Sequence, residues 1–126
     1  MIHFDTSFLV RACINGTAED LAIRGWVRDG EQFGVSAIAW AQFLCGPVSP
    51  DDARVVAALL AQPQPFDVDD AGVAARLYNE TGRRRSSFAD CVIAAAALRA
   101  EAPLATSDLR DFRRFEPFGL RLVSPT

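Results

Sequence analysis

The sequence contains 126 residues, of which 50% are hydrophobic and 23% are charged, and its formal net charge at pH 7 is −3. This size and composition predict one globular domain, 1–126, and exclude a disordered chain. The longest apolar runs are too short to span a membrane, and no basic segment precedes an apolar one at the N-terminus, so we expect a soluble, cytoplasmic protein with no membrane partner. The acidic balance argues against broad electrostatic binding of nucleic acid, so such binding would rest on local clusters of the 13 basic residues, all of them arginine.

Short strands alternate with helices along the sequence. The strands are predicted at Met1–Phe4, Phe33–Val35, Phe66–Val68, Leu104–Thr106 and Leu120–Val123. The helices are predicted to begin at capping residues, namely Thr17, Ser36, Ser49, Asp69 or Asp70, and Ser87. This alternation predicts an α/β fold of three layers, with a central parallel sheet of about five short strands flanked by helices.

The segment from Phe88 to Arg99 is apolar almost all round, which predicts a helix in the interior of the domain. Asp90 lies in its first turn, where a carboxylate is costly to bury without a partner. Two interpretations of Asp90 remain open. Ser87 and Asp90 have the spacing of a capping box, so Asp90 could bind only backbone N–H groups, or it could belong to a functional site.

Three aspartates that are distant in the sequence are predicted to meet at one edge of the sheet. Asp5 follows the first strand, Asp108 follows a later strand, and Asp90 begins a crossover helix, which starts where strands end. Ligands of open parallel sheets bind at this edge. Because converging carboxylates repel, we expect a hard divalent cation, Mg²⁺ or Mn²⁺, to join them. Asp5 and Asp108 could instead cap a helix and a turn.

Other residues with potential chemistry are interpreted as structural. His3 lies within a predicted strand without other ligands at metal-binding spacing. Cys13, Cys45 and Cys91 also lack such spacing, and each lies in an apolar helical context, so we expect buried, reduced thiols. The absence of lysine argues against α/β enzymes in which a strand-end aspartate works with a lysine.

Four segments stand in the order and spacing of a known family, and they are Phe4–Leu9, Ser36–Ile38, Phe88–Ala95 and Leu104–Phe112. Together they resemble the PIN domain, most closely the VapC-type toxins of bacterial toxin–antitoxin pairs, over essentially the whole chain. The resemblance implies a parallel sheet flanked by helices and Mg²⁺- or Mn²⁺-dependent cleavage of RNA phosphodiester bonds. It also implies a homodimer and a small antitoxin protein as partners.

By position, the resemblance implies that Asp5, Asp90 and Asp108 are the catalytic, metal-binding acids and that Asp111 is an auxiliary acid. The chain departs from the family at Gln42, where a glutamate is usual. An amide oxygen can still coordinate a metal or hold a water, but it contributes no charge. Three outcomes remain open: an active enzyme with a modified site, a weak enzyme, or a non-catalytic PIN-like module that binds RNA or a protein.

Two groups of arginines flank the predicted acidic edge. They are Arg83, Arg84 and Arg85 before the central helix, and Arg110, Arg113 and Arg114 after Asp108. Arginine favours bidentate contacts with phosphate, so both groups are candidates for RNA binding. The alternative is that they are solvated loop charges.

Overall fold

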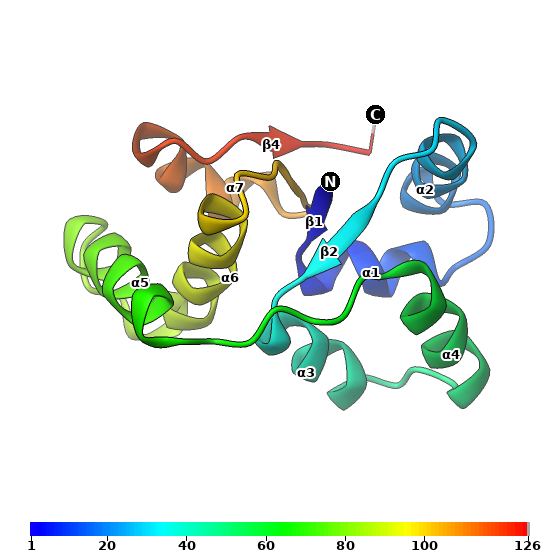
Figure 1. The fold of residues 1–126 in the computed structure, drawn as a ribbon, viewed down its shortest axis with the longest axis horizontal. Helices are drawn as coiled ribbons and strands as arrows, with labels where there is room; N and C mark the ends of the chain where they lie inside the picture. Colours follow the sequence, from blue (N-terminus) through cyan, green and yellow to red (C-terminus); the bar gives the residue numbers. More distant parts are fainter. Residues whose placement is uncertain (126) are drawn as a thin grey trace.

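The chain alternates short strands with helices, as predicted, in a computed structural model that describes residues 1–125 (Figure 1); Thr126, the last residue of the expected domain, lies outside them. The strands are β1 Ile2–Phe4, β2 Phe33–Val35, β3 Leu104–Ala105 and β4 Leu122–Val123. The α-helices are α1 Thr6–Ala12, α2 Ala18–Arg28, α3 Ala37–Cys45, α4 Pro50–Leu59, α5 Val68–Glu80, α6 Phe88–Arg99 and α7 Leu109–Phe112. There are also two 3₁₀ helices within residues 1–125: η1 Arg85–Ser87 directly precedes α6, and η2 Arg113–Phe118 directly follows α7.

The strands form one parallel sheet in the order β2-β1-β3-β4. This confirms the predicted α/β fold with a central parallel sheet. In Figure 1, α5 and α6 lie together on one side of β1 and β2, whereas α2 and α4 lie on the other. Because all strands point the same way, the residues that follow β1, β2 and β3 lie at one edge of the sheet, and these are Asp5, Ser36 and Thr106.

The sheet has four strands in residues 1–125 rather than about five, and the prediction of a strand at Phe66–Val68 was wrong. Asp67 caps α5 instead. Its carboxylate accepts the N–H of Asp70 at 3.0 Å, and the Asp70 carboxylate accepts the N–H of Asp67 at 3.0 Å. This capping box starts a helix at Val68, so Asp67, not Asp69 or Asp70, is the N-cap.

Two isolated parallel bridges take the place of the missing strand beside β2. Leu60 pairs with Phe33, and Gln64 pairs with Ser36. Pro63 and Pro65 lack the N–H that a continuous ladder needs, which explains why the pairing stays limited to single bridges.

Helix α6 is buried almost all round, as its apolar sequence predicted. Residues 91–97 are all buried, and α6 packs along α5, beside it in Figure 1. Of the three cysteines, only Cys91 is buried; Cys13 is half-buried and Cys45 is exposed, so the expectation of three buried thiols was wrong for these two. None of the helices within residues 1–125 is both long enough and apolar enough to cross a lipid bilayer.

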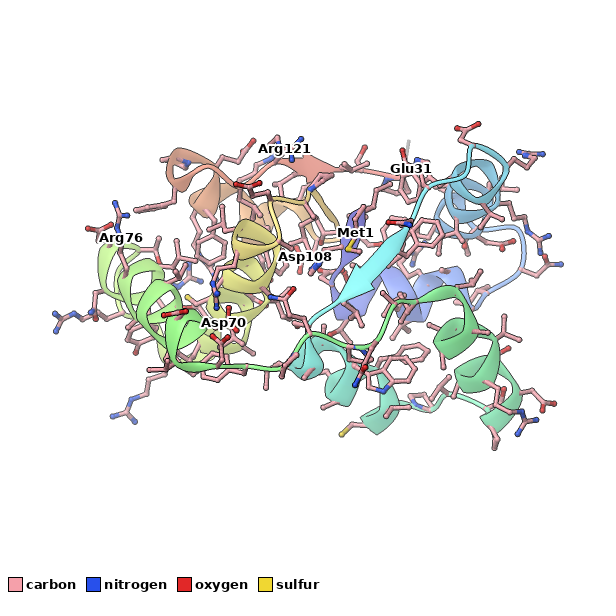
Figure 2. The ribbon with its side chains drawn as sticks, viewed as in Figure 1. Met1, Glu31, Asp70, Arg76, Asp108 and Arg121 are labelled. Atoms are coloured by element: carbon pink, nitrogen blue, oxygen red, sulfur yellow. The ribbon has the colours of Figure 1, made fainter. Side chains whose placement is uncertain are left out.

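The close approach of β1 and β2 requires glycine at position 34. A Cβ atom there would lie 2.7 Å from His3 Nε2 and 2.8 Å from Met1 Sδ, and Figure 2 shows Met1 beside β2. Met1 is exposed and can move aside, but His3 is only 2% exposed. Burial, and to a smaller extent the N-terminal ammonium, lowers the pKa of His3 to about 4, so the imidazole next to Gly34 is uncharged at neutral pH.

We therefore predict that Gly34→Ala destabilises the protein by about 1–3 kcal/mol, because the buried imidazole has to shift. Gly72→Ala is the matched control, since a Cβ on this exposed α5 glycine meets no atom within 4 Å. That change should stabilise the protein by about 0.5–1 kcal/mol. Urea unfolding of both variants measures the difference, and equal effects would contradict the packing described.

Candidate functional site

Asp5 is the most buried of the predicted site acids, with 3% exposure. Its Oδ1 accepts the N–H of Phe8 at 2.9 Å, so the capping interpretation is correct for α1. The Ser7 hydroxyl also donates to the carboxylate at 2.9 Å, and the Thr106 hydroxyl donates to Oδ2 at 2.6 Å. Burial raises the pKa of Asp5, the hydrogen bonds oppose this effect, and the negative charge of Asp108 adds to it.

Thr106 connects the two loops that follow β1 and β3. Its hydroxyl is fully buried, donates to Asp5 and also accepts the N–H of Asp108 at 2.8 Å. The N–H of Ser107 donates to the Ser7 hydroxyl at 3.3 Å, which adds a second link between the loops. Thr106 was not among the site residues predicted from the sequence, because its partner Asp5 lies 101 positions away.

Asp90 lies half-buried in the first turn of α6 and does not form the capping box that its spacing allowed. The Ser87 hydroxyl donates to the carbonyl of Arg84 at 2.6 Å and makes no capping bond. Instead, the Asp90 carboxylate lies 3.5 Å from Nη2 of Arg114.

The pKa of Asp90 is raised by burial and is further affected by the charges around this carboxylate. Burial raises it to about 6, the Arg114 guanidinium acts against this rise, and the negative charges of Asp111, Asp5 and Asp108 add to it. Asp90 therefore lies within electrostatic reach of every other acid predicted for the site.

Asp108 and Asp111 form a close pair at the start of α7. A hydrogen bond between their side chains raises the pKa of Asp108, and burial and the Asp111 charge raise it further. Asp108 makes no side-chain capping bond to α7. Figure 2 shows Asp108 in the region between α6 and β2. The structure thus brings the four predicted acids to one edge of the sheet, where neighbouring negative charges contribute to the raised pKa of Asp5, Asp90 and Asp108.

Gln42 lies on the exposed face of α3, next to the start of α1. Its Oε1 accepts the Thr6 hydroxyl at 2.6 Å, and Thr6 directly follows Asp5 in the chain. Gln42 therefore stands beside the acidic edge, but its amide oxygen already has a donor.

The six predicted RNA-binding arginines divide into two kinds. Five are exposed, and they are Arg83, Arg84, Arg85, Arg110 and Arg113. The side chain of Arg114 is 18% exposed and contacts Asp90.

The donors at this edge suit a hard divalent cation in kind, because carboxylate and hydroxyl oxygens are the ligands that Mg²⁺ and Mn²⁺ prefer. The Ser107 hydroxyl is buried there and has no hydrogen-bond partner within residues 1–125, so a further oxygen is available. In the same residues, no three His, Cys, Asp or Glu side chains stand close enough together to hold a metal ion. The edge thus supplies the required chemistry, and the acids would have to turn toward one another to share an ion.

A protein family and several known structures match nearly the whole chain. The PIN domain family model matches residues 2–116. No curated protein matches the chain. FitAcB from Neisseria gonorrhoeae has a similar structure, with 22% identity, a TM-score of 0.70 and coverage of 99% of this chain and 98% of that one.

Two further complexes have similar structures. VapBC2 from Rickettsia felis, bound to a DNA fragment from its promoter, has 17% identity, a TM-score of 0.76 and coverage of 98% of both chains. A toxin–antitoxin complex from Klebsiella pneumoniae has 21% identity, a TM-score of 0.74 and coverage of 100% of this chain and 98% of that one. At these identities the similarity concerns the fold, which agrees over nearly the full length.

The raised pKa of Asp90 predicts that this carboxylate opposes folding at neutral pH when no divalent cation is present. The folded state holds the Asp90 proton up to about pH 6, whereas the unfolded state releases it near 3.8. The stabilising contribution of this proton is therefore lost as the pH rises from about 4 through 6.

We expect Asp90→Asn in EDTA to be more stable than the parent at pH 7.5, by at most about 3 kcal/mol. This advantage should shrink at pH 4.5, where Asp90 of the parent is mostly protonated. Urea unfolding at both pH values measures the two differences. A variant that is less stable at pH 7.5, or a difference that does not depend on pH, would contradict the repulsion described.

Proposed function

The chain belongs to the PIN domain family, and we propose that it is a metal-dependent ribonuclease that cleaves RNA phosphodiester bonds. The observation that carries this proposal is the gathering of Asp5, Asp90, Asp108 and Asp111 at the carboxyl edge of the sheet. Burial raises the pKa of Asp5 and Asp90, a hydrogen bond to Asp111 raises that of Asp108, and neighbouring negative charges raise all three further. Mutually repelling carboxylates oppose folding, and a shared divalent cation removes that repulsion. We further propose that the protein acts as the toxin of a VapBC-type toxin–antitoxin pair.

In this proposal Asp5, Asp90 and Asp108 hold Mg²⁺ or Mn²⁺, and Asp111 supports Asp108. A bound ion would orient and activate a water and offset the charge that develops on the phosphoryl group. Asp5 is the fixed member, because Thr106, Ser7 and the α1 backbone already orient its carboxylate. Asp90 and Asp108 are more exposed and can turn toward the ion.

The exposed arginines would hold the RNA chain next to this edge. Arg83, Arg84 and Arg85 lie before α6, and Arg110 and Arg113 lie in and after α7, so each group directly adjoins a helix that carries a site acid. Arginines in such positions bind phosphates without reading the base sequence. They concentrate positive charge beside this edge, although the net charge of the whole chain, −3, disfavours RNA.

Similar structures include complexes with antitoxins, and we propose a small antitoxin and a second copy of this chain as partners. A groove of about 580 Å³ between α2 and α4 offers an apolar surface to which either of these two partners could bind. On its rim Val27, Val55 and Leu59 are 47%, 61% and 38% exposed. Apolar side chains grouped in this way are typical of a surface that a protein partner covers.

A non-catalytic module that binds RNA or a protein is the second candidate function. Gln42 favours it, because the residue at this position adds no charge and its Oε1 is engaged by Thr6. An assay of RNA cleavage with and without Mn²⁺ separates the two candidates. Cleavage that requires Mn²⁺ supports the ribonuclease, and RNA binding without cleavage supports the module.

Asp90→Asn should abolish metal-dependent cleavage and leave the fold intact. The change removes a ligand charge where the proposed ion binds, so we expect the cleavage rate to fall by about 100-fold or more. Asp69→Asn is the control, because Asp69 is an exposed acid on α5 whose ion-pair partner is Arg99. The control should cleave like the parent. Cleavage at the parent rate by Asp90→Asn would refute a role of Asp90 in catalysis.

Gln42→Glu should strengthen the response to metal. A glutamate can accept the Thr6 hydroxyl as Gln42 does, but it adds a negative charge beside Asp5. Without a cation this charge worsens the repulsion, so the variant should melt at a lower temperature than the parent. When a cation is bound, the added charge attracts it and becomes stabilising. Mn²⁺ should therefore raise the melting temperature of the variant by more than it raises that of the parent.

Melting curves of both proteins across a Mn²⁺ titration measure this effect. Cleavage by the variant should equal or exceed that of the parent. Identical metal-induced shifts in the two proteins would mean that Gln42 lies outside the metal's reach.

A further inference from the structure

Arg114 differs from the other arginines that the sequence grouped with it. The side chains of Arg110 and Arg113 are exposed, whereas that of Arg114 is 18% exposed and forms an ion pair with Asp90. An arginine that tethers an RNA phosphate needs its guanidinium in solvent. The position of Arg114 therefore indicates a role inside the acidic edge rather than on the RNA path.

The Arg114 guanidinium is held by two contacts. Its Cζ lies 4.7 Å from the centre of the Phe115 ring, and its Nη2 lies 3.5 Å from Oδ2 of Asp90. The Phe115 ring is fully buried, so it forms a fixed platform. A guanidinium has five N–H donors, yet Nε is buried without a hydrogen-bond partner in residues 1–125, and the contact with Asp90 is long. The guanidinium is thus positioned by packing and charge, and its Nε–H donor is not used in a hydrogen bond within residues 1–125.

The carboxylate that Arg114 contacts is one that the proposed metal ion needs. A divalent cation on Asp90 would lie within a few ångströms of the guanidinium, in a half-buried region where like charges repel strongly. We propose that Arg114 is the built-in counterion of this site, which occupies Asp90 in the absence of metal and must give way when a divalent cation binds. Arg114 therefore sets the affinity of the site for metal, an inference that rests on the proposed metal-dependent function.

This role explains how the acidic edge is tolerated without an ion. Asp5, Asp108 and Asp111 all repel Asp90, and Arg114 is the cation that opposes them. Removal of the Arg114 charge should then have two opposite consequences. The metal-free protein becomes less stable, and the divalent cation binds more tightly because its competitor is gone.

Calorimetric titration of the full chain with Mn²⁺ tests this inference without RNA and without cleavage. We expect Arg114→Gln to bind Mn²⁺ about fivefold or more tightly than the parent. Arg114→Met, whose unbranched side chain can still pack on Phe115, should show the same gain. Arg114→Lys keeps the charge and should stay within about threefold of the parent. Arg113→Gln removes an exposed charge from the same 3₁₀ helix and should change the affinity by less than about twofold.

The possible results separate the inference from the function on which it rests. If the parent binds Mn²⁺ and both neutral Arg114 variants bind it no more tightly, the counterion role is wrong, but the metal site itself is supported. A gain of equal size in Arg113→Gln would also overturn it, because net charge alone would then explain the effect. No Mn²⁺ binding by the parent would overturn the metal site and the inference together. Melting curves in EDTA, recorded beside each titration, identify any variant that does not fold, and the remaining neutral variant then decides.

Discussion

A buried hydrogen bond between the Thr106 hydroxyl and the Asp5 carboxylate fixes the geometry of the sheet edge. It joins the end of β3 to the end of β1 over 2.6 Å, and the same hydroxyl accepts the N–H of Asp108. Thr106 and Asp5 are 0% and 3% exposed, so neither group can replace its partner with water while the chain stays folded. The orientation of one candidate ligand and the backbone of another thus depend on a single hydroxyl group.

Around this bond, the acidic edge works against the stability of the fold. Asp90 has a pKa of about 6 because burial and three other carboxylates disfavour its charge. Arg114 offsets part of this repulsion, and a divalent cation would offset more. Gln42 limits the same repulsion, since a glutamate there would add a further negative charge next to Asp5. The affinity for metal and the stability of the metal-free fold are therefore coupled through the same few side chains.

Much of this architecture could be predicted from the sequence. The apolar run of α6 and the acids after β1 and β3 have local signatures, and the parallel sheet then brings Asp5, Asp90 and Asp108 to one edge. The expected strand at 66–68 was wrong because a local capping box, which Asp67 and Asp70 form, starts a helix there.

The contacts that complete the site could not be predicted. The hydroxyl partner of Asp5 comes from a segment 101 residues away. Nothing in the sequence near Thr106 distinguishes it from the other Ser and Thr residues of the chain. Likewise, nothing in the sequence separates Arg114 from Arg113. Only the packing of Arg114 on Phe115 and its approach to Asp90 reveal that it belongs to the acidic edge.

Whether this edge holds a divalent cation can be seen in a crystal structure of the protein grown with Mn²⁺. Anomalous scattering locates manganese independently of the protein atoms. We expect a Mn²⁺ peak bonded to the carboxylates of Asp5, Asp90 and Asp108. The absence of manganese from this edge in such crystals, or manganese bound only by other acids such as those at 67–70, would contradict the proposed metal site.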